Sequence, residues 1–198
     1  MEQVRSFIAI ELPEQLKSEL DQLQARLKSG SQLGIKWVNP YSIHLTLKFL
    51  GNIAAGRIGE ITRAIEEAAE GISPFQLEIK GLGVFPNLRR VQVAWVGVGG
   101  QIDKLARLQQ RIEATLARLG FARESRPFSP HLTLARVRDR ASTEERQKFG
   151  QIIANANLET NHLSEVKAIS LMKSQLTREG AIYSQISSVE LKKTCQQP

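Results

Sequence analysis

The chain has 198 residues, of which 41% are hydrophobic and 24% charged, a composition typical of a globular protein and unlike that of a disordered or fibrous one. Its net charge of +7 favours polyanionic partners such as RNA and nucleotides. The single cysteine, Cys195, excludes a disulfide framework and a thiolate metal cluster. No apolar run approaches the roughly 20 residues of a membrane-spanning helix. Glu11 directly follows the short N-terminal apolar run, so we expect a cytoplasmic protein with no membrane partner.

The first half of the chain is predicted to fold as strand, helix, strand, helix and strand. Leucines spaced by three and four residues mark the first helix, which begins at Pro13 and ends near Gly30. Gly71 ends the second helix. The predicted ranges are 5–12, 13–30, 44–50, 58–71 and 75–80, followed by a glycine-rich loop over 81–87.

The second half is predicted to repeat this order. An apolar strand turns at two glycines into a leucine-rich helix, which Gly120 stops. A loop with two prolines then leads to another strand, and a polar helix and two strands complete the chain. The predicted ranges are 91–98, 102–119, 131–137, 143–155, 166–171 and 181–191.

One tetrapeptide occurs in both halves: His44-Leu45-Thr46-Leu47 recurs unchanged as His131-Leu132-Thr133-Leu134. Polar and apolar residues alternate in each copy, so a strand would bury the leucines and place the histidine and threonine on one face. The preceding apolar strands lie at nearly the same distance, because Ile8 lies 36 residues before His44 and Ala94 lies 37 before His131. We therefore expect one domain with duplicated lobes, about 1–86 and 87–198, whose two His-Thr faces line one cleft.

Two histidines facing one site can perform acid-base catalysis. Their unperturbed pKa near 6.5 allows one neutral and one protonated ring at physiological pH. The neutral ring would take a proton from water while the cation gives one to the leaving oxygen. Threonine hydroxyls beside the rings could hold two phosphate oxygens. The four residues therefore indicate cleavage of a phosphate ester.

Other catalytic chemistries fit the sequence less well. Hydrolytic metal sites usually include a carboxylate, and no Asp or Glu lies in or beside either tetrapeptide, although a remote one could still join. No cofactor or metal is therefore expected. A Gly-x-Ser-x-Gly motif is missing, and Cys195 sits in a polar tail. His162 lacks the motif and is expected to be a solvated loop residue.

The sequence resembles the 2H phosphoesterases, and within them the RNA 2′,3′-cyclic phosphodiesterases, historically called 2′-5′ RNA ligases. This resemblance implies a duplicated α+β fold with two antiparallel sheets facing a central cleft and helices outside. It also implies metal-free hydrolysis of an RNA 2′,3′-cyclic phosphate end, or of a small 2′,3′-cyclic nucleotide, to a 2′-phosphate by a monomer. The matching stretches are 5–10, Trp37 with 44–51, 83–86 and 130–136, with a looser match over 174–183.

The resemblance assigns roles to the motif residues. His44 is the expected proton donor and His131 the acceptor, although the pseudo-symmetry leaves this order open. Thr46 and Thr133 are expected to hold the phosphate.

Three further residues are candidates for substrate binding. The resemblance implies that Phe7 stacks on a base and that Arg136 contacts a phosphate or a base. Arg136 follows His131 by five residues, an odd offset, so a bulge or the strand end must turn its side chain into the cleft. Lys48 follows His44 by four residues and is expected on the His-Thr face, as a source of positive potential or as a solvated lysine.

Two other functions remain open from the sequence. The same residues could run the reverse reaction, the 2′-5′ ligation of RNA halves such as those of tRNA. A non-catalytic module that binds RNA or nucleotides is the second alternative.

Overall fold

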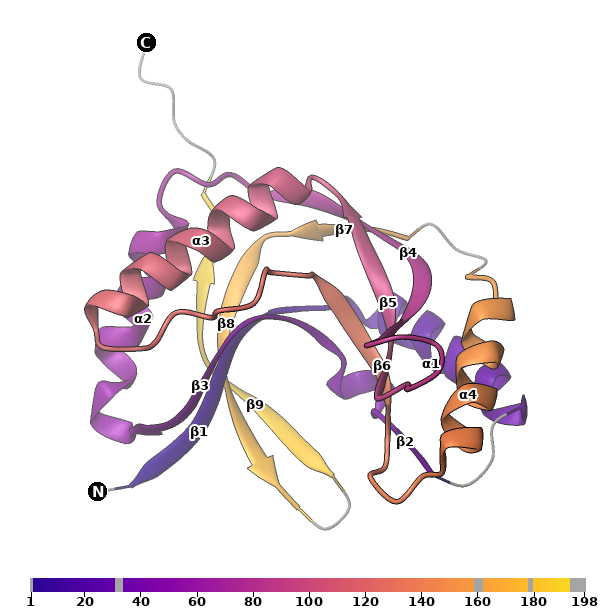
Figure 1. Cartoon of the computed structure of the whole chain (residues 1–198). Coiled ribbons are helices and arrows are strands. Elements are labelled where there is room, and N and C mark those ends of the chain that lie inside the picture. Colours follow the sequence, from indigo (N-terminus) through magenta and orange to yellow (C-terminus); the bar gives the residue numbers. More distant parts are fainter. Residues whose placement is uncertain (1, 31–33, 159–161, 178–179, 193–198) are drawn as a thin grey trace.

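The computed structural model describes residues 2–30, 34–158, 162–177 and 180–192, and Cys195 lies outside them. No helix in this part of the chain has the length and apolarity needed to cross a membrane. The elements, shown in Figure 1, are β1 (Gln3–Glu11), α1 (Glu14–Gly30), β2 (Ile35–Trp37), β3 (His44–Ala54), α2 (Ile58–Ala69), β4 (Phe75–Phe85), β5 (Val93–Gly100), α3 (Ile102–Arg118), β6 (His131–Val137), α4 (Thr143–Asn155), β7 (His162–Val166), β8 (Ala168–Leu176) and β9 (Ala181–Glu190).

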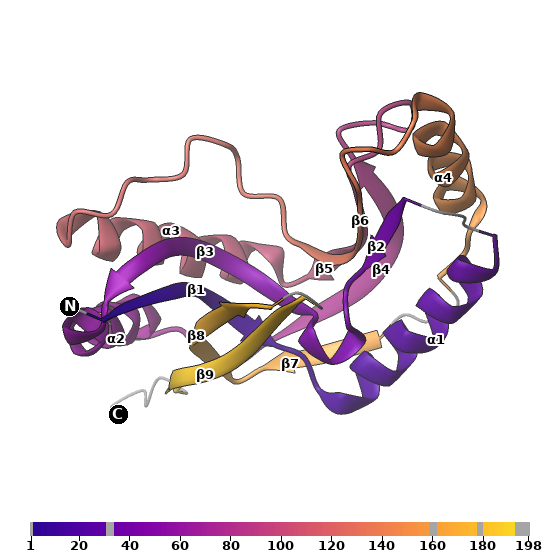
Figure 2. The same ribbon diagram turned by 90° about the horizontal axis from the view of Figure 1, so that it is seen from below.

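The strands form one curled antiparallel sheet in the order β7-β4-β5-β6-β3-β1-β8-β9, with β2 also paired to β6. Its two parts are joined through β3 and β6 at the pair Leu45 and Leu132. We call β3, β1, β8 and β9 the first sheet half, and β6, β5, β4, β7 and β2 the second sheet half. The α+β class is confirmed, while the two expected sheets are hydrogen-bonded into one (Figure 2).

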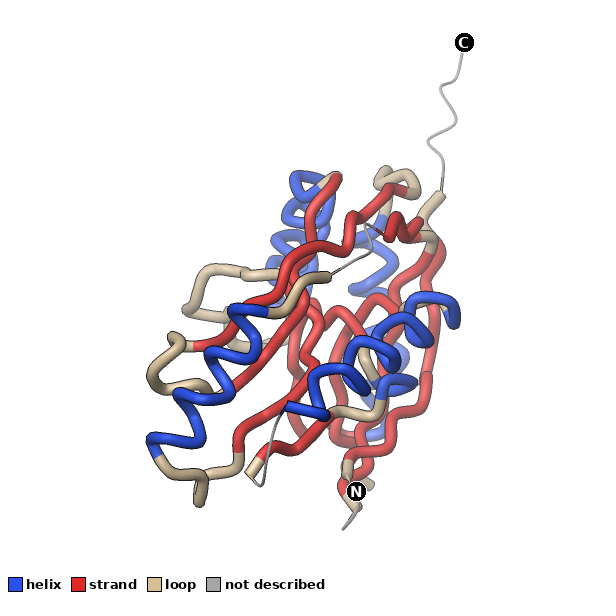
Figure 3. The backbone as a smooth tube through the Cα atoms, turned by 90° about the vertical axis from the view of Figure 1, so that its right-hand side faces the viewer, coloured by secondary structure: helices blue, strands red, loops and turns tan. Residues whose placement is uncertain are grey.

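The helices cover the outside of the curled sheet (Figure 3). Helices α2 and α3 pack together beside the first sheet half, and α1 and α4 lie beside the second (Figure 1). Their apolar faces are buried as the leucine spacing predicts; Leu16, Leu20 and Leu23 of α1 and Leu105 and Leu108 of α3 are all inaccessible to solvent or nearly so. This arrangement leaves the other side of the sheet open at the junction of the two halves.

The sheet halves are not two continuous stretches of chain. Strand β4 follows α2 but pairs with β5, and β8, which comes after α4 and β7, pairs with β1. In the first sheet half β1 lies between β3 and β8, and in the second β5 lies between β6 and β4. By this position β3 corresponds to β6, and β8 corresponds to β4. A cut near residue 86 would separate β4 from β5, so the lobes 1–86 and 87–198 remain a prediction about the sequence repeat.

The predicted loop over 81–87 is wrong, because β4 continues to Phe85. Gly81 has a φ of +69° and lies at a register shift in the pairing with β5, so it forms a bulge and does not end the strand. At Gly83 a Cβ atom would lie 2.3 Å from the ring of Trp95. Gly81 therefore permits the bulge, and Gly83 leaves room for the indole ring of Trp95. The single strand predicted over 166–171 is in fact two strands, β7 and β8.

Candidate active site

The two tetrapeptides begin the strands β3 and β6, which meet at the centre of the sheet. Their leucines are buried in the main core, as the alternation predicts. The histidines and threonines lie on the opposite face and line one cavity of about 430 Å³. The structure thus brings together His44, Thr46, His131 and Thr133.

Both histidine rings are oriented by the same backbone contact. The Nδ1 atom of His44 lies 2.8 Å from the carbonyl oxygen of Ser42, and that of His131 lies 2.7 Å from the carbonyl oxygen of Ser129. A carbonyl oxygen only accepts hydrogen bonds, so each Nδ1 carries the proton. The Nε2 atom of each ring can then accept a proton from, or donate one to, another group.

Aromatic rings pack against both histidines. Phe7 stacks on His44 with ring centroids 4.5 Å apart, and Tyr183 meets the same ring edge-on at 4.9 Å. Phe85 packs edge-on against His131 at 5.0 Å. Burial lowers the pKa of His44 below its ordinary 6.5, while the hydrogen bond to the carbonyl of Ser42 and the charge of Glu11 act in the opposite direction. In the free protein the His44 ring therefore favours its neutral form.

A bulge brings Arg136 to the cleft. Ala94 pairs with Ala135 and Trp95 pairs with Thr133, so Leu134 is an extra residue in β6. The alternation shifts by one position, and Arg136 lines the cavity although its offset from His131 is odd. The bulge therefore turns the side chain of Arg136 into the cavity, as expected.

Strand β3 has an equivalent bulge, which overturns the prediction for Lys48. Ile8 pairs with Lys48 and Ala9 with Thr46, so Leu47 is the extra residue. Lys48 consequently turns to the helix side, where its Nζ donates to Glu113 at 2.7 Å and to the carbonyl oxygen of Ala122 at 2.8 Å. It does not share the face of His44 and lies outside the cavity lining among the described residues.

The same shift places Phe49 on the cavity wall, where 69% of this residue is exposed. Sequence analysis missed Phe49, although it follows His44 by the same five residues that separate Arg136 from His131. Phe7 does line the cavity, but it is only 2% exposed because it packs between His44 and Tyr183. Base stacking on Phe7 would require one of these rings to move.

Sequence analysis also missed the two serine carbonyls. A signal was present, because Ser42 and Ser129 each stand two residues before the histidine, so the repeat reads Ser-x-His-Leu-Thr-Leu. His162 is misassigned: it begins β7, and its Nδ1 atom lies 3.2 Å from a carboxylate oxygen of Glu19.

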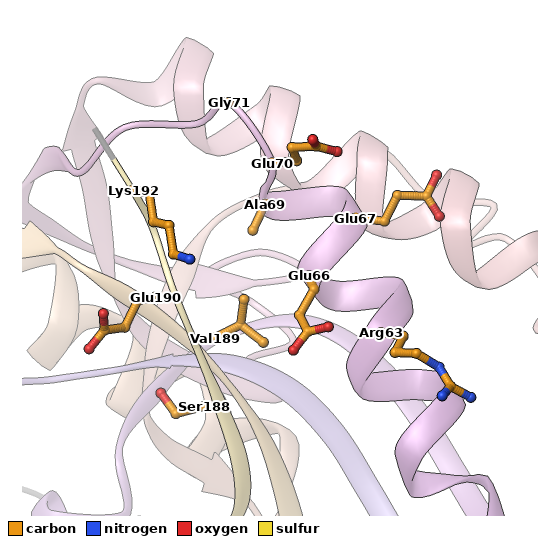
Figure 4. A pocket seen from close by; sticks show the side chains of 10 residues that line it. All are labelled: Arg63, Glu66, Glu67, Ala69, Glu70, Gly71, Ser188, Val189, Glu190 and Lys192. Atoms are coloured by element: carbon orange, nitrogen blue, oxygen red, sulfur yellow. The ribbon is translucent and has the colours of Figure 1, made fainter. Parts of the chain in front are cut away.

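A larger hollow, about 720 Å³, lies between α2 and the end of β9, away from both motifs (Figure 4). Its charged lining is mostly acidic: Glu66, Glu67, Glu70 and Glu190, with Arg63 and Lys192. Such a lining repels phosphate, whereas the described lining of the histidine cavity has arginines and no carboxylate. The histidine cavity is therefore the candidate active site. Within the described ranges, no cluster of three or more His, Cys, Asp or Glu side chains is suited to hold a metal ion.

Comparisons with known proteins agree with this geometry. A family model described as LigT-like phosphoesterase matches the chain twice, over residues 10–95 and 96–183. A protein of Methanothermobacter thermautotrophicus named RNA 2′,3′-cyclic phosphodiesterase is 34% identical over 189 residues, covering 95% of this chain and 99% of the relative. One of Aquifex aeolicus with the same name is 30% identical over 194 residues, covering 96% and 99%.

Two solved structures have a similar fold. The protein TT0787 of Thermus thermophilus matches with a TM-score of 0.77 and 25% identity over 94% of this chain and 97% of its own. Escherichia coli LigT complexed with 3′-AMP matches with a TM-score of 0.78 and 23% identity over 97% of this chain and 100% of its own.

Proposed function

Because the chain belongs to the LigT-like phosphoesterases, we propose that it hydrolyses the 2′,3′-cyclic phosphate at an RNA end, or of a small cyclic nucleotide, to a 2′-phosphate. This membership confirms the resemblance inferred from the two motifs together with the other matching stretches. The proposal rests above all on the equivalent setting of His44 and His131. Each Nδ1 is hydrogen-bonded to a backbone carbonyl oxygen, and both rings line the same cavity as Thr46 and Thr133.

The proposed reaction is an attack by water on phosphorus. The water oxygen bonds to phosphorus while His131 takes a proton from the water. His44 gives its proton to O3′ as the P–O3′ bond breaks. The phosphate stays on O2′, and the two histidines then exchange protons with solvent to restore their starting forms. The hydroxyls of Thr46 and Thr133 donate hydrogen bonds to the two non-bridging oxygens.

The donor role requires a protonated His44, whereas burial lowers its pKa in the free protein. The bound cyclic phosphate is an anion, and a nearby negative charge favours the imidazolium form. Substrate binding would therefore favour the uptake of a proton from solvent by His44, as this assignment needs.

We also propose that the reaction needs no metal. The two histidines account for both proton transfers, and the described lining of the cavity offers no carboxylate to complete a metal site.

The test is turnover of adenosine 2′,3′-cyclic phosphate in excess EDTA, with identification of the product. We expect 2′-AMP, and a loss of about 10²- to 10⁴-fold in kcat for His44→Ala and for His131→Ala. Thr46→Val and Thr133→Val should each lower kcat by about 10- to 100-fold with little change in stability, because the shape is kept while a donor is lost. Formation of 3′-AMP, loss of turnover in EDTA, or full activity of either histidine variant would contradict the proposal.

The order of the two roles has its own test. A phosphodiester that releases p-nitrophenolate needs no proton on its leaving group, so a variant lacking only the donor should keep much of its activity on that substrate. We expect such retention in His44→Ala and not in His131→Ala. The opposite result would reverse the two assignments.

A further inference from the structure

A second hollow, about 570 Å³, adjoins the histidine cavity. We call it the basic groove; Lys36 and Trp37 of β2 and Ala181, Ile182 and Tyr183 of β9 contribute to its walls. The two hollows share a boundary because five residues line both of them: Val38, Ser42, Arg136, Ala181 and Tyr183. A ligand that fills the histidine cavity and extends over this boundary would enter the basic groove.

The charged residues of the basic groove are Lys28, Lys36 and Arg136, with no carboxylate among its described lining residues. Lys28 lies over the ring of Trp37, with Nζ 5.6 Å from the centroid. This composition contrasts with the acidic hollow beside α2. The basic groove therefore suits an anion and not a cation or an uncharged peptide.

Lys36 and Arg136 make the strongest argument for a bound anion. They are directly opposite each other in the antiparallel pairing of β2 and β6, so their side chains leave the same face of the sheet. Like charges at such a pair destabilise a sheet. Neither side chain has a hydrogen-bond or ion-pair partner among the described residues. An anion lying across both would relieve their repulsion.

We propose that this pair binds the phosphodiester that links the terminal nucleotide of an RNA to the nucleotide before it. The inference rests on the proposed function, which places the terminal cyclic phosphate between the two histidines. A 2′,3′-cyclic phosphate lies at the 3′ end of a strand, so the rest of the strand leaves the cavity through the 5′ oxygen. Arg136 lies at the boundary, and Lys36 lies beyond it in the basic groove. The preferred substrate is then an oligonucleotide and not a mononucleotide.

The test compares adenosine 2′,3′-cyclic phosphate with a tetranucleotide that ends in a 2′,3′-cyclic phosphate. Lys36→Ala should raise KM for the tetranucleotide about two- to fivefold at low salt, with kcat unchanged. Both constants for the mononucleotide should stay at their original values. Lys167→Ala is the matched control, because Lys167 is an exposed lysine outside both hollows. The same effect on both substrates, or no effect on either, would overturn the proposal.

Salt dependence gives a second measure. Each phosphate contact on a single strand contributes about −0.7 to the slope of log affinity against log salt. The slope for the tetranucleotide should therefore become shallower by about this amount in Lys36→Ala, and it should not change in Lys167→Ala. An unchanged slope in Lys36→Ala would count against a phosphate at this pair.

Failure of the proposed function can be told apart from failure of the basic groove. If the protein hydrolyses neither substrate, the proposed function is wrong, and binding still tests the groove. Fluorescence anisotropy with a labelled tetranucleotide ending in a 2′-phosphate should then show weaker binding to Lys36→Ala than to Lys167→Ala. Equal affinities of the two variants would overturn the groove proposal.

Discussion

Phe49 and Arg136 occupy equivalent positions in the two sheet halves. Each follows its histidine by five residues, and each reaches the cavity because one extra residue, Leu47 or Leu134, interrupts the alternation. The duplicated backbone thus presents an aromatic ring at one position and a guanidinium at the other.

These two side chains should contribute in different ways. Arg136→Ala should lower kcat/KM by about 10- to 100-fold for every cyclic phosphate, because the guanidinium lines both hollows and would donate hydrogen bonds to the terminal phosphate as well as to the internucleotide phosphate. Phe49→Ala should raise KM by about 5- to 100-fold, because a base loses its stacking partner. An abasic ribose 2′,3′-cyclic phosphate distinguishes the two roles, because it has no base to stack on Phe49. Its KM should change in Arg136→Ala and not in Phe49→Ala. A response of this abasic substrate to Phe49→Ala would contradict the stacking role.

Gln24 is expected to position the bulge in β6. It is fully buried, and its Nε2 donates to the carbonyl oxygen of Leu134 at 3.1 Å and to that of Val38 at 2.8 Å. Gln24→Leu should cost about 1–3 kcal/mol of unfolding free energy, because two hydrogen bonds that each contribute about 0.5–1.5 kcal/mol are lost. It should also raise KM through displacement of Arg136.

A double-mutant cycle checks this coupling. In an Arg136→Ala background, Gln24→Leu should still destabilise the protein but should raise KM no further. Additive effects on KM would show that Gln24 acts independently of Arg136.

Lys48 should matter for stability and not for turnover. Only 5% of its side chain and 12% of that of Glu113 are exposed, so Lys48→Met would leave a buried carboxylate without its cation. We expect a loss of about 3–5 kcal/mol in denaturant unfolding, with most of it recovered in the double variant Lys48→Met/Glu113→Leu. Lys80→Met is the matched control, because its pair with Glu78 is more exposed and should be worth less than about 1 kcal/mol. A changed kcat/KM in the folded double variant would show that Lys48 does contribute to substrate binding or turnover.

His44 should make stability depend on pH. Burial lowers its pKa in the folded state below 6.5, so the unfolded chain binds this proton more readily. His44 therefore contributes fully to stability above its pKa in the unfolded chain. This contribution is lost as the pH falls from that pKa toward the lower pKa of the folded state. Between about pH 7 and about pH 5 the unfolding free energy should therefore fall more in the original protein than in His44→Gln. Chemical denaturation of the two proteins at several pH values measures this difference, and an equal fall of the unfolding free energy in both would contradict it.

Much of the fold could be predicted because its signals are local. The alternation in the two tetrapeptides predicts strands with buried leucines. Apolar spacing with glycine stops predicts α1, α2 and α3 closely, and the polar helix predicted over 143–155 is α4. The bulges at Leu47 and Leu134 could not be found in this way, because a bulge is defined by the pairing of one strand with its neighbour. That is why Lys48 was placed on the wrong face.

The site could be predicted only in part. The repeat predicts that both histidines and both threonines line one cleft, and all four line the histidine cavity. The odd offset of Arg136 requires a bulge, and β6 contains one. The repeated serines mark the positions of the two carbonyls, but their hydrogen bonds to the histidine rings depend on the backbone path, which the serine side chains do not reveal. The basic groove needed the register of β2 against β6, because Lys36 and Arg136 are far apart in the sequence.

The exchange of β4 and β8 between the sheet halves has a further consequence. A protein made of a single repeat would lack one strand of its own half and would offer that strand to another molecule. It could complete the sheet only as a domain-swapped dimer, with one histidine contributed by each copy. Joining two copies in one chain makes the meeting of the histidines an intramolecular event, so the cleft forms independently of protein concentration.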